Sequence, residues 1–239
     1  MFRQIREDIR TIQERDPAAR SGLEVLLLYS GLHAVIAYRI SHWLFSRRRF
    51  FLARWVSQYA KFRTGIEIHP GAKIGKGLFI DHGTGVVVGE TTEIGDYCTL
   101  YQGVTLGGTG KEKGKRHPTL GNNVMVGSGA KVLGPVYIGD NAKVGANALV
   151  ISQVPANSTA VGVPAHVVRI NGRRVQNASD LDQVHMPDPV SQEICRLYVK
   201  IGELQRQIDS LASGLTGEAP PEPDPAAMTK PEKKGCSSI

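Results

Sequence analysis

A histidine beside an aspartate is the strongest candidate for catalysis in this chain of 239 residues. Asp81 and His82 stand in the stretch Ile80-Asp81-His82-Gly83-Thr84-Gly85. Histidine is the side chain best suited to take a proton from a hydroxyl group near neutral pH. Such a base normally needs a third group that fixes its tautomer, and Glu67 precedes His82 by fifteen residues. The pattern therefore predicts a general base at His82, with Glu67 within reach of its imidazole.

A basic loop is the second place where the residue types point to chemistry. Residues 107–119 read Gly-Gly-Thr-Gly-Lys-Glu-Lys-Gly-Lys-Arg-His-Pro-Thr. This stretch contains no aliphatic residue, although a regular aliphatic pattern continues on both sides of it. Because inserted loops of this kind often carry function, we expect a functional loop that projects from one corner of the fold.

The element that must position both groups is a repeat with a period of six residues. Aliphatic side chains recur at this spacing at Ile68, Ile74, Ile80, Val88, Ile94, Leu100, Leu106, Leu120, Val126, Val132, Ile138, Val144 and Val150. The spacing is interrupted twice, by two extra residues before Val88 and by the basic loop before Leu120. Small or β-branched residues follow four places later, as at Ala72 and Thr84. A period of six is neither the helical value of about 3.6 nor the strand value of about 2.

This repeat predicts a parallel β-helix, in which short strands and tight turns form the sides and corners of a prism. Ile80 and Thr84 would point inward, so Asp81 and His82 would lie at an outward corner. The alternative is an ordinary β-sandwich with short strands.

The residues before the repeat are predicted to form an α-helical cap, residues 1–63. The spacing of Ile5, Ile9 and Ile12 predicts a helix over residues 2–15 that ends before Asp16-Pro17. Two more helices are expected over residues 22–38 and 40–62, the latter with a break at 47–49. These helices contain five aromatic residues that are expected to pack against neighbouring helices or the first coil: Trp43, Phe45, Phe51, Trp55 and Tyr59. Such a cap covers the exposed end of a repeat array.

The β-helix is predicted to span residues 64–172, and residues 173–239 to form a C-terminal extension. Residues 165–175 are expected to form a single strand that leaves the prism. Apolar residues then recur at alternating steps of three and four, at Ile194, Leu197, Ile201, Leu204, Ile208 and Leu211. This spacing predicts a helix over about residues 190–213 that forms a short coiled coil between chains. Residues 214–239 are proline-rich and charged, which predicts disorder.

The composition limits the classes of function. The formal net charge is +7, but no nucleic-acid-binding motif accompanies the spread basic residues, so we expect no nucleic-acid partner. The apolar run over residues 23–40 contains Glu24, His33 and Arg39, too many polar groups for a membrane span. Three widely separated cysteines suggest no disulfide framework, which favours a cytoplasmic protein.

A set of motifs in this chain resembles that of the serine O-acetyltransferases, a family of hexapeptide-repeat acyltransferases. The matching segments are Glu67-Ile68-His69-Pro70-Gly71-Ala72, Ile80-Asp81-His82-Gly83-Thr84-Gly85, Val88-Gly89-Glu90-Thr91, Val104-Thr105-Leu106-Gly107-Gly108-Thr109-Gly110-Lys111, Arg116-His117-Pro118 and Gly162-Val163-Pro164-Ala165. Arg15-Asp16-Pro17-Ala18 matches a motif of the family's helical domain. The combination is far more specific than the six-residue repeat alone.

The resemblance implies a left-handed parallel β-helix that forms a homotrimer, with active sites between neighbouring prisms. It implies transfer of the acetyl group of acetyl-CoA to the hydroxyl group of L-serine, which gives O-acetyl-L-serine for cysteine biosynthesis. L-cysteine would act as a feedback inhibitor, and no metal is expected. Longer family members pair trimers through extra N-terminal helices, so the short cap of this chain puts a hexamer in doubt.

The resemblance also implies the roles of single residues. The catalytic base falls on His82 and its orienting carboxylate on Glu67, where some members have aspartate. L-serine would be held by two carboxylates for its ammonium group and by cationic or polar side chains for its carboxylate, namely Asp16, Asp81, Arg116 and His117.

The same resemblance places the coenzyme. Acetyl-CoA would be held by Gly108, Thr109, Ser128, Lys143 and Ala146. No side chain resembles a covalent nucleophile, so direct transfer in a ternary complex is expected. A backbone N–H of the glycine-rich loop is the expected donor to the charge that develops on the thioester oxygen.

The last residue, Ile239, suggests a protein partner. In this family a C-terminal isoleucine inserts into the active site of O-acetylserine sulfhydrylase. A flexible tail would suit such peptide capture, although a terminal isoleucine can also be accidental.

Three other functions compete with this one. A γ-type carbonic anhydrase would bind zinc between subunits, with His69, His82 and His117 as conceivable ligands, but Arg116 beside His117 would repel the cation. A sugar or antibiotic acetyltransferase would share the fold without needing residues that hold an amino acid. A regulatory scaffold for the sulfhydrylase would not need an intact base.

Overall fold

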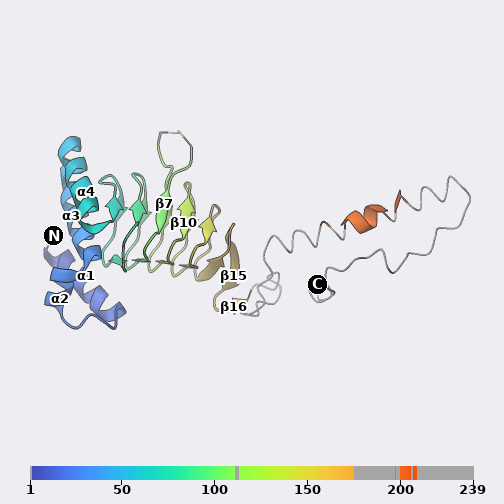
Figure 1. The fold of residues 1–239 in the computed structure, drawn as a ribbon, viewed down its shortest axis with the longest axis horizontal. Helices are drawn as coiled ribbons and strands as arrows, with labels where there is room; N and C mark the ends of the chain where they lie inside the picture. Colours follow the sequence, from blue (N-terminus) through green and yellow to red (C-terminus); the bar gives the residue numbers. More distant parts are fainter. Residues whose placement is uncertain (1, 111–112, 175–196, 198–199, 206, 209–239) are drawn as a thin grey trace, which may run out of the picture. The chain divides into compact units, whose positions relative to one another are not determined.

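The structure is a computed structural model that describes residues 2–110, 113–174, 197, 200–205 and 207–208. The chain divides into one compact unit, residues 1–175, and a second unit, residues 176–239. The first unit contains four helices and sixteen strands among its described residues. In Figure 1 these helices lie at one end of the stacked strands.

The helical cap begins with α1 (Phe2–Arg15), which confirms the predicted first helix. The prediction for residues 22–38 is wrong, because the chain breaks there into α2 (Gly22–Leu28) and α3 (Ser30–Ser46). Tyr29 between them has extended backbone angles, φ −84° and ψ 106°. Ser21 begins α2 by accepting a hydrogen bond from the N–H of Glu24, as an N-cap serine does.

The last helix, α4 (Phe50–Thr64), follows the predicted break at residues 47–49. Residues 40–46 belong to α3 and not to this helix. α4 ends at Gly65, whose φ of 71° needs the conformational freedom of glycine, and whose N–H donates to the carbonyl of Lys61. The first strand begins two residues later, so α4 leads directly onto the β-helix.

The strands form three parallel sheets that make up the sides of a prism. The first sheet contains β1 (Glu67–Ile68), β4 (Val87–Val88), β7 (Thr105–Gly107), β10 (Lys131–Leu133) and β13 (Leu149–Val150). The second contains β2 (Lys73–Ile74), β5 (Glu93–Ile94), β8 (Thr119–Leu120) and β11 (Tyr137–Ile138). The third contains β3 (Phe79–Ile80), β6 (Thr99–Leu100), β9 (Met125–Val126), β12 (Lys143–Val144) and β14 (Ser158–Val161). The chain passes through the three sheets in turn, which confirms the predicted parallel β-helix.

The strand register locates the two interruptions of the repeat. Regular coils advance by eighteen residues, as from Val87 to Thr105 and from Lys131 to Leu149. The coil from Glu67 to Val87 contains two extra residues, at the turn that carries His82. The coil from Thr105 to Lys131 is longer because it contains the basic loop, which lies between β7 and β8 in the chain. In Figure 1 this loop projects from the prism next to β7.

The core is a column of aliphatic side chains inside the prism. All thirteen repeat positions are buried except Ile74, which is partly buried and packs on the same cluster. Thr84 is exposed, contrary to the prediction, and Val86 is fully buried instead. The inward position is set by its distance from the next strand, so the two extra residues displace it from Thr84 to Val86.

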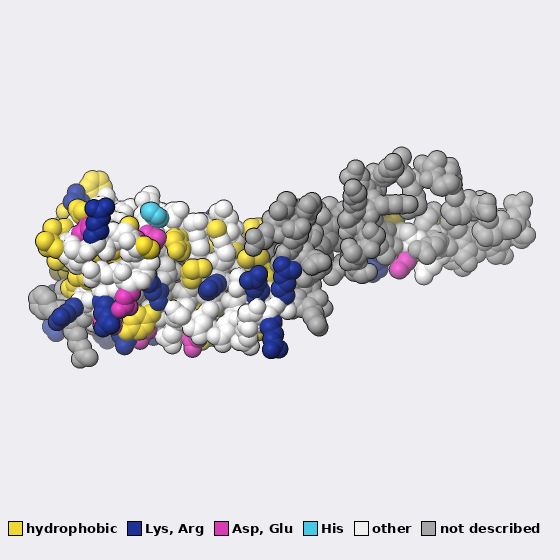
Figure 2. All heavy atoms as spheres, turned by 90° about the horizontal axis from the view of Figure 1, so that it is seen from below, with side chains coloured by type: hydrophobic (Ala, Val, Ile, Leu, Met, Phe, Trp, Pro, Cys, Tyr) yellow, Lys and Arg dark blue, Asp and Glu magenta, His cyan; other side chains and the backbone are white. Residues whose placement is uncertain are grey.

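Four of the five aromatic side chains of the cap contradict the predicted packing, and Phe45 confirms it. Trp43, Phe51, Trp55 and Tyr59 are exposed by 53%, 80%, 63% and 57%, whereas Phe45 is partly buried and lies edge-on to Phe50 and to His69 of the first coil. α4 instead packs its small residues Ala53, Ser57 and Ala60 inward. Figure 2 shows hydrophobic side chains on the surface at the helical end of the unit.

The far end of the prism closes with a hairpin in place of the single strand expected over residues 165–175. β15 (His166–Ile170) pairs antiparallel with β14, and β16 (Arg173–Arg174) pairs antiparallel with β15. The turn between them contains Asn171 and Gly172, both with positive φ. Because the chain reverses direction here, β15 covers the free edge of β14, the last parallel strand.

In the second unit the structure describes Leu197 and residues 200–205, 207 and 208, all of them helical. Leu197, Ile201, Leu204 and Ile208 are each more than half exposed. The rest of the predicted coiled coil, the predicted disorder and Ile239 lie outside the described residues. The predicted division into three domains stays a prediction.

No single helix among the described residues is long and apolar enough to cross a membrane. α2 and α3 together meet the criteria of length and composition, but they are bent by 71° at Tyr29.

Candidate active site

The turn after β3 holds the two residues that the sequence marks as catalytic. It joins the third sheet to the first, and its hydrogen bonds from Gly83 N to Asp81 O and from Thr84 N to His82 O make it tight. His82 has a φ of 57°, which is uncommon for a residue with a side chain and occurs often at functional sites. Its side chain is 75% exposed, and Nε2 lies 3.9 Å from Oδ1 of Asp81. The imidazole is therefore open to a substrate and lies beside a carboxylate.

Asp16 is brought to the same turn by the cap, although it is far away in the sequence. Arg15 anchors the end of α1 to the prism by donating to Oγ1 of Thr99 at 2.5 Å and to Oδ1 of Asn123 at 3.0 Å. The Asp16 carboxylate accepts from the hydroxyl of Tyr29 at 2.6 Å and from the N–H of Ala18 at 2.8 Å.

The electrostatics of Asp16 show that these groups influence one another. The hydrogen bond from Tyr29 lowers the pKa of Asp16, with help from the Ala18 N–H and from the charge of His82. The same hydrogen bond raises the pKa of Tyr29 to about 12, and the charge of Asp81 contributes. Asp16 and Asp81 therefore form one cluster with the exposed imidazole of His82.

Glu67 lies on β1 and is held from the cap. Its carboxylate binds Nζ of Lys61 at 2.6 Å and the guanidinium of Arg54 at 3.3 Å, both from α4. The hydrogen bond from Lys61 lowers the pKa of Glu67. Among the described residues no hydrogen bond or ion pair joins Glu67 to His82, so the orienting role of this carboxylate stays a prediction.

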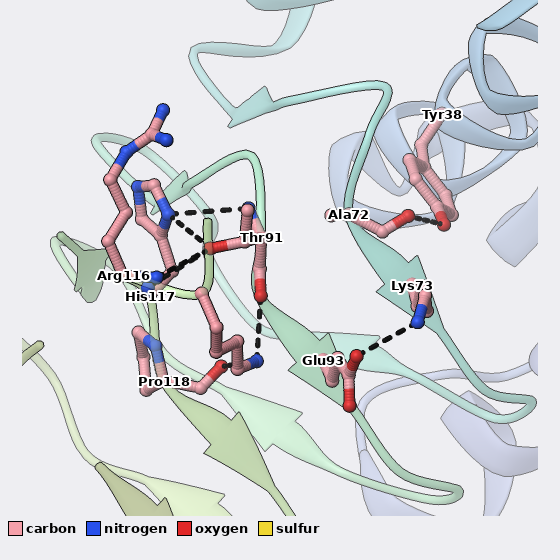
Figure 3. Close-up of polar contacts among 9 residues, drawn as sticks. Tyr38, Ala72, Lys73, Thr91, Glu93, Arg116, His117 and Pro118 are labelled. Atoms are coloured by element: carbon pink, nitrogen blue, oxygen red, sulfur yellow. Dashed lines mark hydrogen bonds and ion pairs between the residues drawn. The ribbon is translucent and has the colours of Figure 1, made fainter. Parts of the chain in front are cut away.

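The end of the basic loop forms a second cluster, at the corner between the first and second sheets. Arg116 forms an ion pair with Glu90. His117 and Arg116 are both hydrogen-bonded to Thr91 (Figure 3). His117 is 9% exposed, and burial lowers its pKa. Burial likewise lowers the pKa of His69 nearby, whose Nδ1 accepts from the N–H of Gly71.

The predicted coenzyme residues divide between two corners. Gly108 and Thr109 are exposed at the start of the basic loop. Ser128 and Ala146 lie in turns after β9 and β12, at the same edge as His82, and Lys143 is exposed on β12.

The site residues thus occupy two different edges of the prism. Asp16, Asp81 and His82 lie with Ser128 and Ala146 where the third sheet meets the first. Gly108, Thr109, Arg116 and His117 lie where the first sheet meets the second. No hydrogen bond or ion pair connects the two groups within the part of the chain that the structure describes. Within the described residues, the predicted site is therefore divided between two edges of one chain.

Comparison with known proteins decides the family. The N-terminal domain of serine acetyltransferases matches residues 1–37, and the bacterial transferase hexapeptide repeat matches residues 117–152. A serine acetyltransferase of Staphylococcus aureus is 52% identical over 214 residues, which cover 90% of this chain and 96% of the relative. The chain belongs to the serine acetyltransferase family.

Solved structures of serine acetyltransferases agree with this membership. The enzyme of Neisseria gonorrhoeae, solved in complex with serine, has a TM-score of 0.68 and 43% identity over 70% of this chain and 69% of its own. The enzyme of Brucella abortus, solved in complex with coenzyme A, has a TM-score of 0.69 and 40% identity over 70% of this chain and 67% of its own. These matches confirm the predicted left-handed β-helix and an acyltransferase.

Membership in the serine acetyltransferase family also decides between the competing functions. The chain is a hexapeptide-repeat enzyme of this family, and the carbonic anhydrase is not supported. Within the described residues, no three His, Cys, Asp or Glu side chains converge as a metal site would require. Whether the protein holds a metal stays a prediction.

Two residues of this serine acetyltransferase were not assigned a role by the sequence. Tyr29 was expected inside a helix, and only the break between α2 and α3 turns its hydroxyl to Asp16. Thr91 stands in the motif Val88-Gly89-Glu90-Thr91, which supported the resemblance without indicating a role. Its five contacts with the loop are visible only in the fold.

Proposed function

We propose that this chain transfers the acetyl group of acetyl-CoA to the hydroxyl group of L-serine, with O-acetyl-L-serine and CoA as products. The observation that carries the proposal is the cluster of Asp16, Asp81 and His82. An amino-acid acceptor needs carboxylates for its ammonium group and a base for its hydroxyl group, and this cluster supplies both at one exposed turn.

The reaction proceeds by direct transfer. His82 takes the proton of the serine hydroxyl as its oxygen forms a bond to the thioester carbonyl carbon. The carbon–sulfur bond then breaks, and the imidazolium returns the proton to the CoA sulfur. A covalent intermediate on Cys98 is disfavoured, because burial raises the pKa of its thiol to about 11.

The family resemblance assigns the binding residues, and their charges support the assignment. Asp16 and Asp81 hold the serine ammonium group, and Arg116 with His117 holds its carboxylate. Glu67 orients the base, and its lowered pKa keeps it ionised near neutral pH. Acetyl-CoA contacts Gly108, Thr109, Ser128, Lys143 and Ala146, with a loop N–H donating to the thioester oxygen. The relatives solved with serine and with coenzyme A support these two ligands.

We infer a homotrimer, because the two edges that carry the site residues face different directions on one prism. Contact between one edge of a chain and the other edge of its neighbour would complete three identical sites. The exposed aromatic face of α4 gives the cap a surface for further contacts.

Three further properties belong to this proposal. L-cysteine, which has the ammonium and carboxylate groups of L-serine, would compete at the serine site. The terminal Ile239 would bind O-acetylserine sulfhydrylase. A cytoplasmic enzyme fits the buried, unpaired thiol of Cys98.

The experiment that tests the function is a measurement of CoA release from acetyl-CoA with a panel of acceptors. L-serine is expected to be the best acceptor, ahead of other amino acids, sugars and aminoglycosides. A preference for a sugar or an aminoglycoside would overturn the proposal. Metal analysis of the same sample tests the anhydrase, which would contain one tightly bound zinc ion per chain.

A further inference from the structure

Thr91 is the residue around which the end of the basic loop is organised. It follows β4, at the corner between the first and second sheets, and five interactions converge on it (Figure 3). Its Oγ1 accepts hydrogen bonds from the N–H of Arg116 and the N–H of His117, both at 3.1 Å. Its carbonyl accepts from Nζ of Lys115 at 2.7 Å. Nδ1 of His117 lies 2.9 Å from the hydroxyl oxygen and 3.3 Å from the backbone nitrogen of Thr91.

These contacts determine which nitrogen of His117 carries the proton. A threonine hydroxyl has two lone pairs and one hydrogen. Both lone pairs are used by the N–H groups of Arg116 and His117, so the hydrogen is free to point at Nδ1. The N–H of Thr91 donates to the same atom. A proton on Nδ1 would face two donors, and the neutral ring therefore carries its proton on Nε2.

Two glycines hold the ring in this orientation. A Cβ atom at Gly89 would lie 1.9 Å from Cδ2 and 2.1 Å from Nε2 of His117. A Cβ atom at Gly108 would lie 3.1 Å from Nε2. The imidazole thus occupies space that the missing side chain of Gly89 leaves open, with Nε2 near Gly108 at the start of the basic loop.

The charges around the ring favour its neutral form. Burial lowers the pKa of His117, and the neighbouring Arg116 and Lys115 lower it further, while Glu90 acts in the opposite direction. A neutral imidazole with the proton on Nε2 donates a hydrogen bond from that atom and cannot accept one there. His117 therefore differs from the exposed His82, which has no such partner on its ring among the described residues apart from Asp81.

We propose that Thr91 is a positioning residue that fixes His117 as a neutral Nε2–H donor and holds Arg116 beside it, so that the pair grips the carboxylate of the acceptor amino acid. The inference rests on the proposed function for the identity of the acceptor. The tautomer itself follows from the contacts of Thr91 and can be measured without any substrate.

The first test compares three variants by steady-state kinetics. Thr91→Val keeps the shape of the side chain but removes the hydroxyl, and Thr91→Ser keeps the hydroxyl. Thr92→Val is the matched control, because the buried hydroxyl of Thr92 has no hydrogen-bond partner among the described residues. Thr91→Val is expected to raise KM for L-serine roughly tenfold or more, with kcat changed about twofold at most. Thr91→Ser should restore most of the loss, and Thr92→Val should leave both constants unchanged.

The second test is nitrogen NMR of the wild-type protein labelled in histidine, with His117→Gln used to assign the signal of residue 117. A neutral ring with its proton on Nε2 is expected, and loss of that single tautomer in Thr91→Val. A proton on Nδ1 in the wild type, or normal KM for L-serine in a folded Thr91→Val, would overturn the inference. If the wild type prefers another acceptor, the proposed function fails, while the NMR result still decides the tautomer.

Discussion

The hydroxyl of Tyr29 donates a hydrogen bond of 2.6 Å to Oδ2 of Asp16, across the break between α2 and α3. This contact lowers the pKa of Asp16 and fixes one of its oxygens, while the N–H of Ala18 binds the other. The break in the helix is therefore a functional feature, because a continuous helix would not place the tyrosine there.

Tyr29→Phe is expected to raise KM for L-serine and to change its pH dependence. Loss of the hydrogen bond raises the pKa of Asp16, so the carboxylate becomes protonated at a higher pH as the solution is acidified. The acidic limb of L-serine binding, measured by calorimetry, should move to higher pH than in the wild type; the acidic limb of kcat/KM is set by the base, His82. Tyr137→Phe, at an exposed position, is the control, and an unchanged limb in Tyr29→Phe would contradict the role of this contact.

His82→Ala is expected to lose most of the turnover while CoA binding is retained. A general base contributes a factor of roughly 100 to 10,000 in rate. The exposed imidazole makes few contacts, so the variant should keep the fold. CoA release and CoA binding by calorimetry measure the two effects, and near-normal turnover would remove His82 as the base.

Lys61→Met is expected to destabilise the protein near neutral pH by about 1 kcal/mol or less, as for a partly exposed ion pair. The pKa of Glu67 is lowered from 4.5, so the stabilisation is present above 4.5 and is lost as the pH falls through the folded value. Denaturant unfolding at neutral pH and well below pH 4.5 should show a difference from the wild type only at neutral pH. An equal difference at both pH values would mean that Lys61 does not act through Glu67.

Gly31→Ala is expected to destabilise the fold by about 2 kcal/mol or more, because α3 packs too closely on β3 to accept a side chain. A Cβ atom at Gly31 would lie 2.2 Å from the carbonyl oxygen of Ile80. At Gly22 the nearest atom would be 3.4 Å away, so Gly22→Ala is the matched control. Thermal unfolding checks both, and equal melting temperatures of the two variants would refute the close contact.

Deletion of Ile239 alone is expected to abolish binding of O-acetylserine sulfhydrylase, because the terminal carboxylate and its apolar side chain would be the anchor. Ser238→Ala keeps the terminal isoleucine and should bind as the wild type does. Calorimetry with the purified sulfhydrylase measures both, and unchanged binding after the deletion would show that the isoleucine is not the anchor.

The six-residue pattern was enough to predict the β-helix and the candidates for its chemistry. One aliphatic residue in every six sufficed because each coil repeats the same inward position, and the two interruptions located His82 and the basic loop. The sequence did not reveal the break at Tyr29, since residues 22–38 are apolar enough for one helix. Nor did it show that Thr84 is exposed, because a count from the preceding strand cannot tell where the extra residues lie.

Which outward side chains meet could be seen only in the folded chain. Hydrogen bonds join residues far apart in the chain, such as Thr91 with His117 and Arg15 with Thr99, and their partners depend on the stacking of coils and the docking of the cap. It also showed that Glu67 pairs with Lys61, and that His82 and Arg116 lie on different edges of the prism. A pattern of spacing specifies which side chains point inward, whereas the pairing of outward side chains depends on which surfaces the folded chain brings together.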